Sequence, residues 1–257
     1  MVPDMGDTWK PAVYERFRAE RDRPLDDLLA LVRPVSGGRV IDLGCGSGSL
    51  TARLHRQTGA SETIGVDTSA SMLSAAPTVD GVEFRHGDLT SFAGEGFDLV
   101  FANASLQWIP DHRSLFAHVW SLIRPGGQLA VHVPSNFDHP SHVVADQVGR
   151  AFGLEPLDRS EQVLTSVEYA TLLHGLGALD EHVRLVVYGA RLDRTDDVIA
   201  WVQGSLLTHY ERELEARFDD FMAEYRARVL EALGDPTGAE PYYYPFPRIL
   251  MTAMKPR

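Results

Sequence analysis

The residues best suited to chemistry are gathered in one short stretch, where three glycines alternate with other residues directly after an apolar run. Residues 39–48 read RVIDLGCGSG. Glycine is favoured where the backbone takes unusual φ/ψ angles and where a ligand approaches the main chain closely. The helix expected next would direct free N–H groups at an anionic part of such a ligand. The stretch therefore predicts a site for a nucleotide-like molecule.

The glycine spacing favours S-adenosylmethionine over a dinucleotide. The dinucleotide fingerprint G-x-G-x-x-G would require glycine at position 49, where this chain has Ser49. The chain instead reads D-x-G-x-G-x-G, and Asp42 at the strand end suits an ammonium or sulfonium charge better than a pyrophosphate. S-adenosylmethionine carries both charges, a carboxylate and an adenosine. A tight turn that binds no ligand would show the same three glycines.

Two further acids follow the next predicted strands. Asp67 ends the second strand, where a carboxylate can accept hydrogen bonds from ribose hydroxyls. Asp88 ends the third strand, where it can accept a hydrogen bond from an adenine amino group while Leu89 packs on the ring. Each acid alone could be a helix cap or a surface residue, but their succession favours one site. The predicted cofactor-binding residues are Asp42, Gly44, Gly46, Gly48, Asp67, Thr68, Met72, Asp88, Leu89, Asn103 and Ala104.

The glycine stretch begins a regular alternation of strands and helices. Strands are predicted at 39–43, 63–67, 82–86, 97–102 and 128–133, and helices at about 48–57, from the capping residue Ser69 to about Pro77, and at about 112–123. This alternation is typical of a parallel, doubly wound sheet with right-handed crossovers. Ligands of such sheets lie at the C-terminal ends of the strands, which is where Gly44, Asp67, Asp88 and Asn103 fall.

Outside this region the pattern is different. Residues 8–33 form an amphipathic helical pattern interrupted by Pro24, and beyond Pro134 come helices at 140–152, 166–175, 195–207 and 210–233, a strand at 183–188 and a final strand within 246–257. We expect one α/β domain over 1–257, with a doubly wound, mostly parallel, seven-stranded Rossmann-like sheet. Residues 36–134 would form the cofactor-binding core. Residues 1–35 and 135–245 would form a helical lid over the C-terminal edge of the strands.

The bulk composition excludes several classes of protein. The formal net charge of −12 over 257 residues provides no field that favours a nucleic acid or an anionic membrane. The single cysteine, Cys45, excludes an internal disulfide and a multi-cysteine metal site, and no metal is expected. No apolar run approaches 18 residues, and no signal pattern is present. We expect a soluble, cytoplasmic monomer that acts on a small molecule.

The order of these motifs resembles that of class I S-adenosylmethionine-dependent methyltransferases. A narrower set of motifs resembles the trans-aconitate methyltransferases. It comprises WKP at 9–11 with Tyr14, Phe17, ER at 20–21 and RP at 23–24, the run FANASLQWIPDH at 101–112, and FPR at 246–248. The segment from about 140 to 240 carries no such motif. This resemblance implies the fold described above and S-adenosylmethionine as the methyl donor, with S-adenosylhomocysteine as product.

The resemblance also implies methyl esterification of one carboxylate of trans-aconitate, a small tricarboxylate. A carboxylate is already ionised at neutral pH, so no general base is required. The enzyme must place that oxygen in line with the sulfonium methyl group and exclude water. Arginine suits carboxylates because its planar fork binds two oxygens. The predicted positioning residues are Arg21 and Arg248, with Tyr14, Trp108, His132, Tyr243 and Tyr244 as further wall or hydrogen-bonding residues.

Two other functions fit the same sequence. One is a methyltransferase that acts on another carboxylic acid or on a hydroxyl group, which would require a base such as His132 or a tyrosine. The other is a non-catalytic nucleotide-binding module, which would require no closed acceptor pocket. A nicotinamide-dependent dehydrogenase is disfavoured by Ser49 and by the lack of a proton-donor motif.

Overall fold

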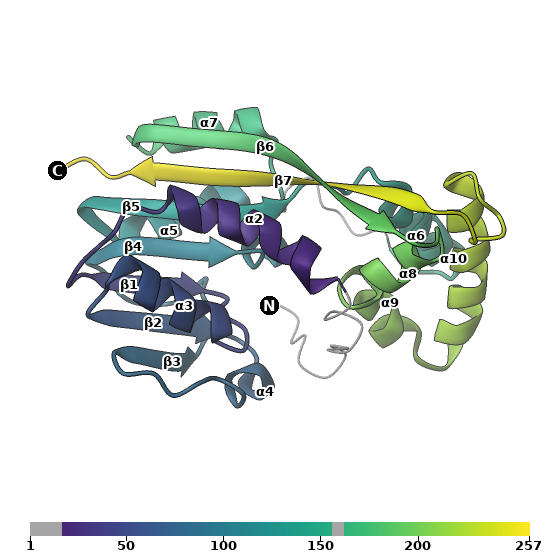
Figure 1. Ribbon diagram of the computed structural model, residues 1–257, viewed down its shortest axis with the longest axis horizontal. Helices are drawn as coiled ribbons and strands as arrows, with labels where there is room; N and C mark the ends of the chain where they lie inside the picture. Colours follow the sequence, from purple (N-terminus) through teal and green to yellow (C-terminus); the bar gives the residue numbers. More distant parts are fainter. Residues whose placement is uncertain (1–16, 156–161) are drawn as a thin grey trace.

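A seven-stranded sheet runs through the molecule in the order β3-β2-β1-β4-β5-β7-β6 (Figure 1). The computed structural model describes residues 17–155 and 162–257. The strands are β1 (Arg39–Leu43), β2 (Glu62–Asp67), β3 (Val82–His86), β4 (Phe97–Asn103), β5 (Ile123–Pro134), β6 (Leu179–Leu192) and β7 (Tyr242–Met254). Only β7 runs antiparallel to its neighbours β5 and β6. The predicted mostly parallel, doubly wound sheet is therefore confirmed.

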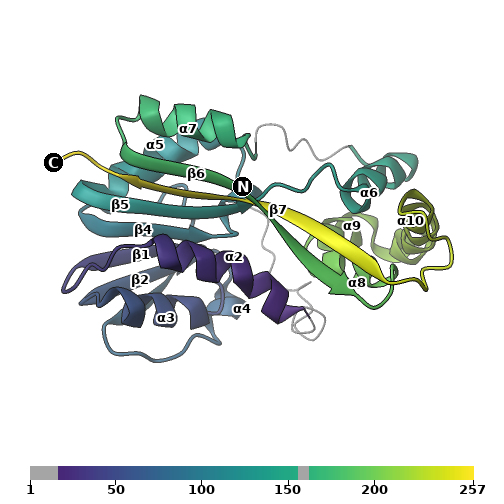
Figure 2. The ribbon, with the colours of Figure 1, turned by 45° about the horizontal axis from the view of Figure 1, so that its top comes forward.

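The central strand β1 shows why this sequence forms a buried parallel sheet. Its residues Val40, Ile41 and Leu43 are fully buried, because helices cover both faces. Val40 packs into a core with helices α2 (Arg18–Leu31) and α3 (Ser49–Thr58). Ile41 points the other way, into a second core with α5 (His112–Leu122) and α7 (Ser166–Gly175). We call these the α2-side core and the α5-side core. The two pairs of helices lie on opposite faces of the sheet in Figure 2.

Two helices differ from their predicted roles. Helix α2 continues through Pro24, where the sequence predicted an interruption. Helix α7 falls within the predicted lid, yet it packs on the sheet next to β6 (Figure 2). Its buried Tyr169 hydroxyl lies 2.5 Å from Nδ1 of His112 in α5, and its Leu173 lies in the α5-side core. Helix α7 therefore buries its apolar side chains against the sheet, next to β6.

Four other helices gather beyond the C-terminal ends of the parallel strands (Figures 1 and 2). They are α6 (Pro140–Ala151), α8 (Asp197–Gln203), α9 (Leu206–Leu214) and α10 (Phe218–Ala232), and we call them the cap helices. A stack of Tyr210, Phe221 and Tyr225 joins α9 to α10. The helix predicted at 210–233 is divided because Glu215 takes a positive φ of 46° between α9 and α10. The short helices α4 (Ala70–Leu73), η1 (Leu106–Trp108) and η2 (Glu215–Arg217) complete the order.

The last two strands are longer than the sequence predicted. Strand β6 covers Leu179–Leu192 instead of 183–188, and β7 begins at Tyr242 instead of residue 246. Pro245 and Pro247 pair with Gly189 and Val187 of β6. On its other side β7 extends beyond the end of β5 at Pro134, so a proline that lacks an N–H interrupts no ladder with β5. The extended β7 runs from the sheet to the cap helices (Figure 1).

None of the helices in residues 17–155 and 162–257 is both long and apolar enough to cross a membrane.

Candidate active site

A cavity of about 590 Å³ lies between the C-terminal strand ends and the cap helices. Its wall includes Gly44 and Gly46 of the glycine loop, Arg21 of α2, Trp201 of α8 and Arg248 of β7. Segments from both ends of the chain therefore meet the glycine loop around one space. The cavity lies at the strand ends to which the sequence assigned the ligand.

The three glycines are required for different reasons. All have positive φ angles of 55–76°. A Cβ atom on Gly44 would meet Ser105 Cβ at 2.2 Å, and one on Gly48 would meet the Phe84 ring at 2.4 Å. A Cβ atom on Gly46 would meet nothing closer than the Met72 methyl group, at 3.4 Å. Gly48 lies off the cavity wall and precedes helix α3. Gly44 and Gly46 both line the cavity, but only at Gly46 is the space beside the main chain open as far as the Met72 methyl group.

Asp67 lies on the cavity wall and also holds the glycine loop. Its two carboxylate oxygens accept hydrogen bonds from the backbone N–H groups of Gly46 (2.8 Å) and Ser69 (2.9 Å). Thr68 and Met72 line the cavity beside it. Ser69 begins α4 by accepting a hydrogen bond from the N–H of Met72, as the sequence predicted.

Asp42 lies behind the glycine loop and does not line the cavity. It is 1% exposed, and one of its oxygens accepts a hydrogen bond of 2.7 Å from Thr51. The other oxygen, Oδ1, has no hydrogen-bond partner among the described residues. Burial raises the pKa of Asp42 to about 7, and the nearby charge of Asp67 adds to this rise. Asp42 therefore acts on a ligand only across the loop.

Of the two residues predicted to bind adenine, Asp88 and Leu89, only Leu89 lies on the cavity wall. Leu89 is buried on the cavity wall. Asp88 is not on that wall, and its carboxylate accepts hydrogen bonds from the N–H (2.8 Å) and the hydroxyl (2.7 Å) of Thr90. In this conformation Asp88 serves the turn after β3.

The segment after β4 forms the next part of the wall. Asn103 and Ala104, which the sequence assigned to the cofactor, both line the cavity. Ala104 takes a φ of 51°, which is rare for a residue with a side chain, and donates its N–H to the carbonyl of His132 at 2.9 Å. The hydroxyl of Ser105 donates to the carbonyl of Leu43 at 2.6 Å. These bonds fix the loop against β1 and β5 in a strained conformation of the kind found at functional sites.

His132 and Gln107 present two buried acceptors to the cavity. His132 Nδ1 lies 2.8 Å from Asn103 Oδ1, an atom that can only accept, so we assign the proton to Nδ1 and the lone pair to Nε2. Burial, aided by the charge of Arg248, lowers the pKa of His132 well below 6.5. Gln107 donates through Nε2 to the carbonyl of Ala104. Neither His132 Nε2 nor Gln107 Oε1 has a hydrogen-bond partner among the described residues. Each atom therefore has a lone pair that no described residue uses.

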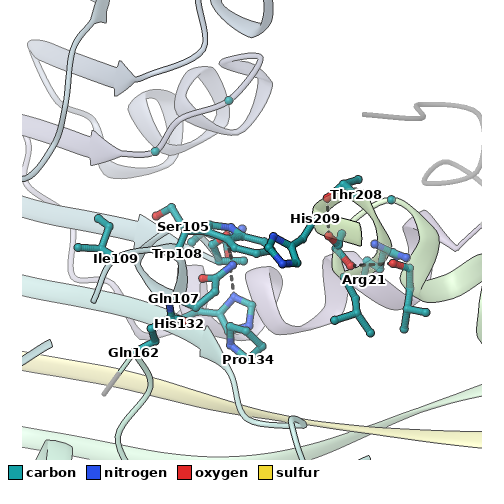
Figure 3. Close-up of a pocket in the computed structure, with 18 of the residues that line it drawn as sticks. Arg21, Ser105, Gln107, Trp108, Ile109, His132, Pro134, Gln162, Thr208 and His209 are labelled. Carbon is teal, nitrogen blue, oxygen red and sulfur yellow. Dashed lines mark hydrogen bonds between the residues drawn. The ribbon is translucent and has the colours of Figure 1, made fainter. Parts of the chain in front are cut away.

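Figure 3 shows how these side chains are distributed. Gln107, Trp108 and His132 lie together on one side of the cavity. Arg21 and Thr208 lie on another side, and His209 of α9 reaches toward Trp108.

Arg21 and Arg248 both line the cavity and rest on the same group of aromatic rings. Arg21 lies 4.8 Å from the centroid of Trp201 and donates to the carbonyl of that residue, near the C-terminus of α8. Arg248 lies 5.2 Å from the centroid of Phe246. Trp201 in turn packs on Phe246 and Tyr244, each at 5.0 Å between centroids. We call Trp201, Tyr244 and Phe246 the aromatic platform.

The other predicted positioning residues differ in whether they line the cavity. Trp108 and the fully buried Tyr244 line the cavity. Tyr243 does not line it, because side chains alternate along β7 and Tyr243 is 59% exposed on the other face. The prediction for Tyr243 is therefore wrong. Tyr14 lies outside the described residues.

Several wall residues were not predicted. They are mainly in the cap and in the segment after β5, and they include Asn136, His142, Trp201, Ser205, Thr208, His209 and Arg212. Their segments carry no motif, so only the folded chain identifies them. Gln107 was missed although it lies within the distinctive run at 101–112. No group of three or more potential metal-binding side chains occurs within 17–155 and 162–257.

Comparison with known proteins gives the chain's relationships. The family described as a methyltransferase domain matches residues 41–131. A trans-aconitate 2-methyltransferase of Deinococcus radiodurans is 36% identical over 97% of this chain and 99% of its own length. One of Escherichia coli is 34% identical over 96% of this chain and 98% of its own length.

Solved structures share the fold at low sequence identity. The YcgJ protein of Bacillus subtilis gives a TM-score of 0.63 at 14% identity, covering 91% of this chain and 99% of that one. Phosphoethanolamine N-methyltransferase 2 of Haemonchus contortus, solved with S-adenosyl-L-methionine, gives 0.57 at 18% identity, covering 92% of this chain and 53% of that one.

Proposed function

Because the chain belongs to the trans-aconitate methyltransferase family of class I S-adenosylmethionine-dependent methyltransferases, we propose that it methylates a carboxylate of trans-aconitate. The chain is an S-adenosylmethionine-dependent methyltransferase. The proposal concerns the acceptor, the reaction and the residues that serve it.

The proposal rests mainly on one observation, which is that Arg21 and Arg248 line the same cavity as the glycine loop. Arg21 and Arg248 come from opposite ends of the chain, yet both lie on the wall that also contains Gly46 and Asp67. The protein as a whole is strongly acidic, with a net charge of −12. Arg212 of α9 also lines the cavity, but it forms an ion pair with Glu213. Arginines gathered in one cavity of such a protein favour a small ligand with several negative charges.

The residues around the glycine loop fit S-adenosylmethionine. The exposed main chain at Gly44 and Gly46 would lie along the methionine part, Asp67 would accept from the ribose and Leu89 would pack on the adenine. His132 Nε2 and Gln107 Oε1 are buried acceptors without partners among the described residues, and the ammonium group of the ligand offers the donors that they need. When bound, S-adenosylmethionine supplies a methyl group that its sulfonium charge activates.

The other residues would orient the acceptor and exclude water. An ionised carboxylate has no proton to lose, so none of the residues on the wall has to act as a base. Arg21 and Arg248 would each hold a carboxylate, and the aromatic platform would keep both guanidinium groups in place. The apolar wall of Trp108, Ile109 and the platform would keep water from the reacting oxygen. His132 is unsuited to hold a carboxylate, because a neutral lone pair would repel it.

A hydroxyl acceptor is the second candidate, and the lone pair on His132 Nε2 is the observation that favours it. This atom could accept a hydrogen bond from a hydroxyl group. The lowered pKa makes His132 a weak base, however, whereas hydroxyl methylation needs proton removal. Methylation of an ionised carboxylate requires no proton removal.

A transfer assay with S-adenosylmethionine labelled in its methyl group tests the proposal. The acceptors are trans-aconitate, its saturated tricarboxylate analogue, a related dicarboxylate and a small alcohol. We expect rapid transfer to trans-aconitate, slower transfer to the other acids and none to the alcohol. Transfer to the alcohol alone would support the second candidate. Absence of transfer to every acid would contradict the proposal. The monomeric state, the cytoplasmic location and the lack of a nucleic-acid partner stay predictions.

A further inference from the structure

Asn136 binds Arg248, one of the two arginines assigned to the acceptor. It follows β5, is 4% exposed and lines the cavity. Its Oδ1 accepts a hydrogen bond of 2.9 Å from Arg248 Nη1, which also donates to the carbonyl of Pro247 at 2.9 Å. Its Nδ2 lies 3.2 Å from the hydroxyl oxygen of Tyr244. One amide group thus connects the arginine to the aromatic platform.

The chemistry of the two neighbours fixes which way the amide faces. Arginine has only donors, so the amide oxygen must face Arg248 and the amide nitrogen must face Tyr244. Burial raises the pKa of Tyr244, so its hydroxyl stays neutral and can accept from the amide. Asn136 therefore satisfies a donor and an acceptor at once, and an apolar side chain could do neither.

The strand pairing brings the two side chains together. Pro134 pairs with Arg248 across β5 and β7, and the N–H of Ser135 continues the ladder to the carbonyl of Pro247. Asn136 follows in the segment between β5 and α6, two residues beyond Pro134. The bond of Ser135 holds the start of this segment against β7, beside Arg248.

A neutral partner has a distinct electrostatic consequence. The amide oxygen orients the guanidinium group without cancelling its charge, whereas a carboxylate at this position would form an ion pair with it. We propose that Asn136 is a specificity-determining residue, which orients Arg248 through a neutral amide instead of a carboxylate and so makes the site select acceptors with a carboxylate there. This inference rests on the proposed function, since it assigns a carboxylate of the acceptor to Arg248.

The nearly isosteric variant Asn136→Asp tests the electrostatic part. Binding of trans-aconitate is measured by calorimetry with S-adenosylhomocysteine present. We expect the dissociation constant to rise about 100-fold or more, because a buried like charge would face the substrate carboxylate. Affinity for S-adenosylhomocysteine should be unchanged. Gln147→Glu is the matched control, since it adds the same charge at an exposed position of α6 and should leave both affinities within about twofold.

A double-mutant cycle tests whether Asn136 acts through Arg248, and it does not depend on the folding of the acidic variant. Asn136→Ala alone should lower kcat/KM for trans-aconitate by roughly 10-fold, in line with the loss of a hydrogen bond to a charged group. In the background of Arg248→Gln it should have almost no further effect, so the two losses should not multiply.

The outcomes separate this inference from the proposed function. Wild-type protein that fails to bind trans-aconitate would overturn the proposed acceptor, and this inference with it. Wild-type protein that binds it, with Asn136→Asp binding within threefold, would overturn the inference alone. Loss of S-adenosylhomocysteine affinity in Asn136→Asp, or multiplying losses in the cycle, would also overturn it, because Asn136 would then serve the fold in general.

Discussion

Asp42 is a buried carboxylate that lies beside the cavity without lining it. It is fully enclosed behind the glycine loop, and Thr51 provides its one hydrogen bond among the described residues. An ionised carboxylate in such a place is costly unless its charge is compensated. A positively charged ligand on the far side of the loop would provide part of that compensation. We therefore expect the free protein to be less stable when Asp42 is ionised.

The variant Asp42→Asn should become relatively more stable as the pH rises. Folding raises the pKa of Asp42 from 3.8 to about 7, so the folded state retains a proton that the unfolded state has lost between these values. Wild-type stability therefore falls across this window, by about 1.4 kcal/mol per pKa unit, whereas the variant lacks this loss. Urea unfolding of both proteins without ligand, at several values from pH 5 to pH 8, measures the effect. A difference between the proteins that is constant with pH would contradict the account of Asp42.

At this scale the sequence predicts the position of a residue along a strand better than the direction of its side chain. Asp67 and Leu89 lie on the cavity wall as expected, whereas Asp42 and Asp88 stand at equivalent strand ends but off the wall. The spacing of motifs specifies where each strand ends. Whether a side chain then enters the cavity depends on local contacts, such as the bonds of Asp88 to Thr90, which no spacing reveals.

The element that joins β1 to α3 separates structural glycines from a functional one. Gly48 is held against the Phe84 ring, and Gly44 against Ser105. Gly46 alone presents its main chain to open space beside Met72. Glycine is therefore required at these three alternate positions for different physical reasons.

Alanine substitutions should distinguish these causes. Gly46→Ala should cost only about 1–2 kcal/mol in the free energy of unfolding, from the positive φ, while weakening S-adenosylmethionine binding at least 10-fold. Gly48→Ala should cost clearly more stability, because its Cβ atom would lie within the Phe84 ring contact. Thermal unfolding and calorimetric titration measure the two quantities. If Gly46→Ala bound S-adenosylmethionine normally, the main chain at this residue would not be a contact surface for the ligand.

Strand β7 shows what the sequence could not predict at the element scale. Its segment from Tyr242 contains Pro245 and Pro247, which argue against a strand when read alone. These prolines are nevertheless accommodated, because the segment pairs with the long β6 on one side and extends beyond the end of β5 on the other. Their missing N–H groups therefore interrupt no ladder with β5. The alternation along the extended strand then directs Tyr244 inward and Tyr243 outward. Long-range pairing therefore decides which tyrosine lines the site.

For the whole molecule, the cap helices are continuous with the sheet. The α2-side core contains Val40 and Leu99 of the sheet together with Phe221 and Tyr225 of α10. The aromatic platform lies within the same core. We therefore expect the cap and the sheet to unfold together, although the sequence pattern divides them at about residue 135. The break in alternation predicts a change of architecture near residue 135, but only packing shows that α7 belongs to the sheet.

The variant Phe221→Ala tests this continuity. Phe221 is fully buried between Tyr210 and Tyr225, so its removal should cost about 3–5 kcal/mol. The variant should still unfold in one transition, at a lower urea concentration than the wild type. Far-ultraviolet circular dichroism and tryptophan fluorescence should give the same midpoint. Ala substitution at the exposed Leu185 of β6 is the control and should change the midpoint little. An early cap transition with an unchanged sheet transition would contradict the single cooperative core.

The chemical nature of the methylated product tests the central claim most directly. Wild-type protein is incubated with trans-aconitate and S-adenosylmethionine labelled in the methyl group, and the isolated product is treated with mild base. A methyl ester releases the label as methanol, whereas a product methylated at carbon retains it. The account predicts one label per trans-aconitate, fully released by base and strongly reduced in the variant Arg248→Gln. A base-stable product, or no labelled trans-aconitate, would contradict it.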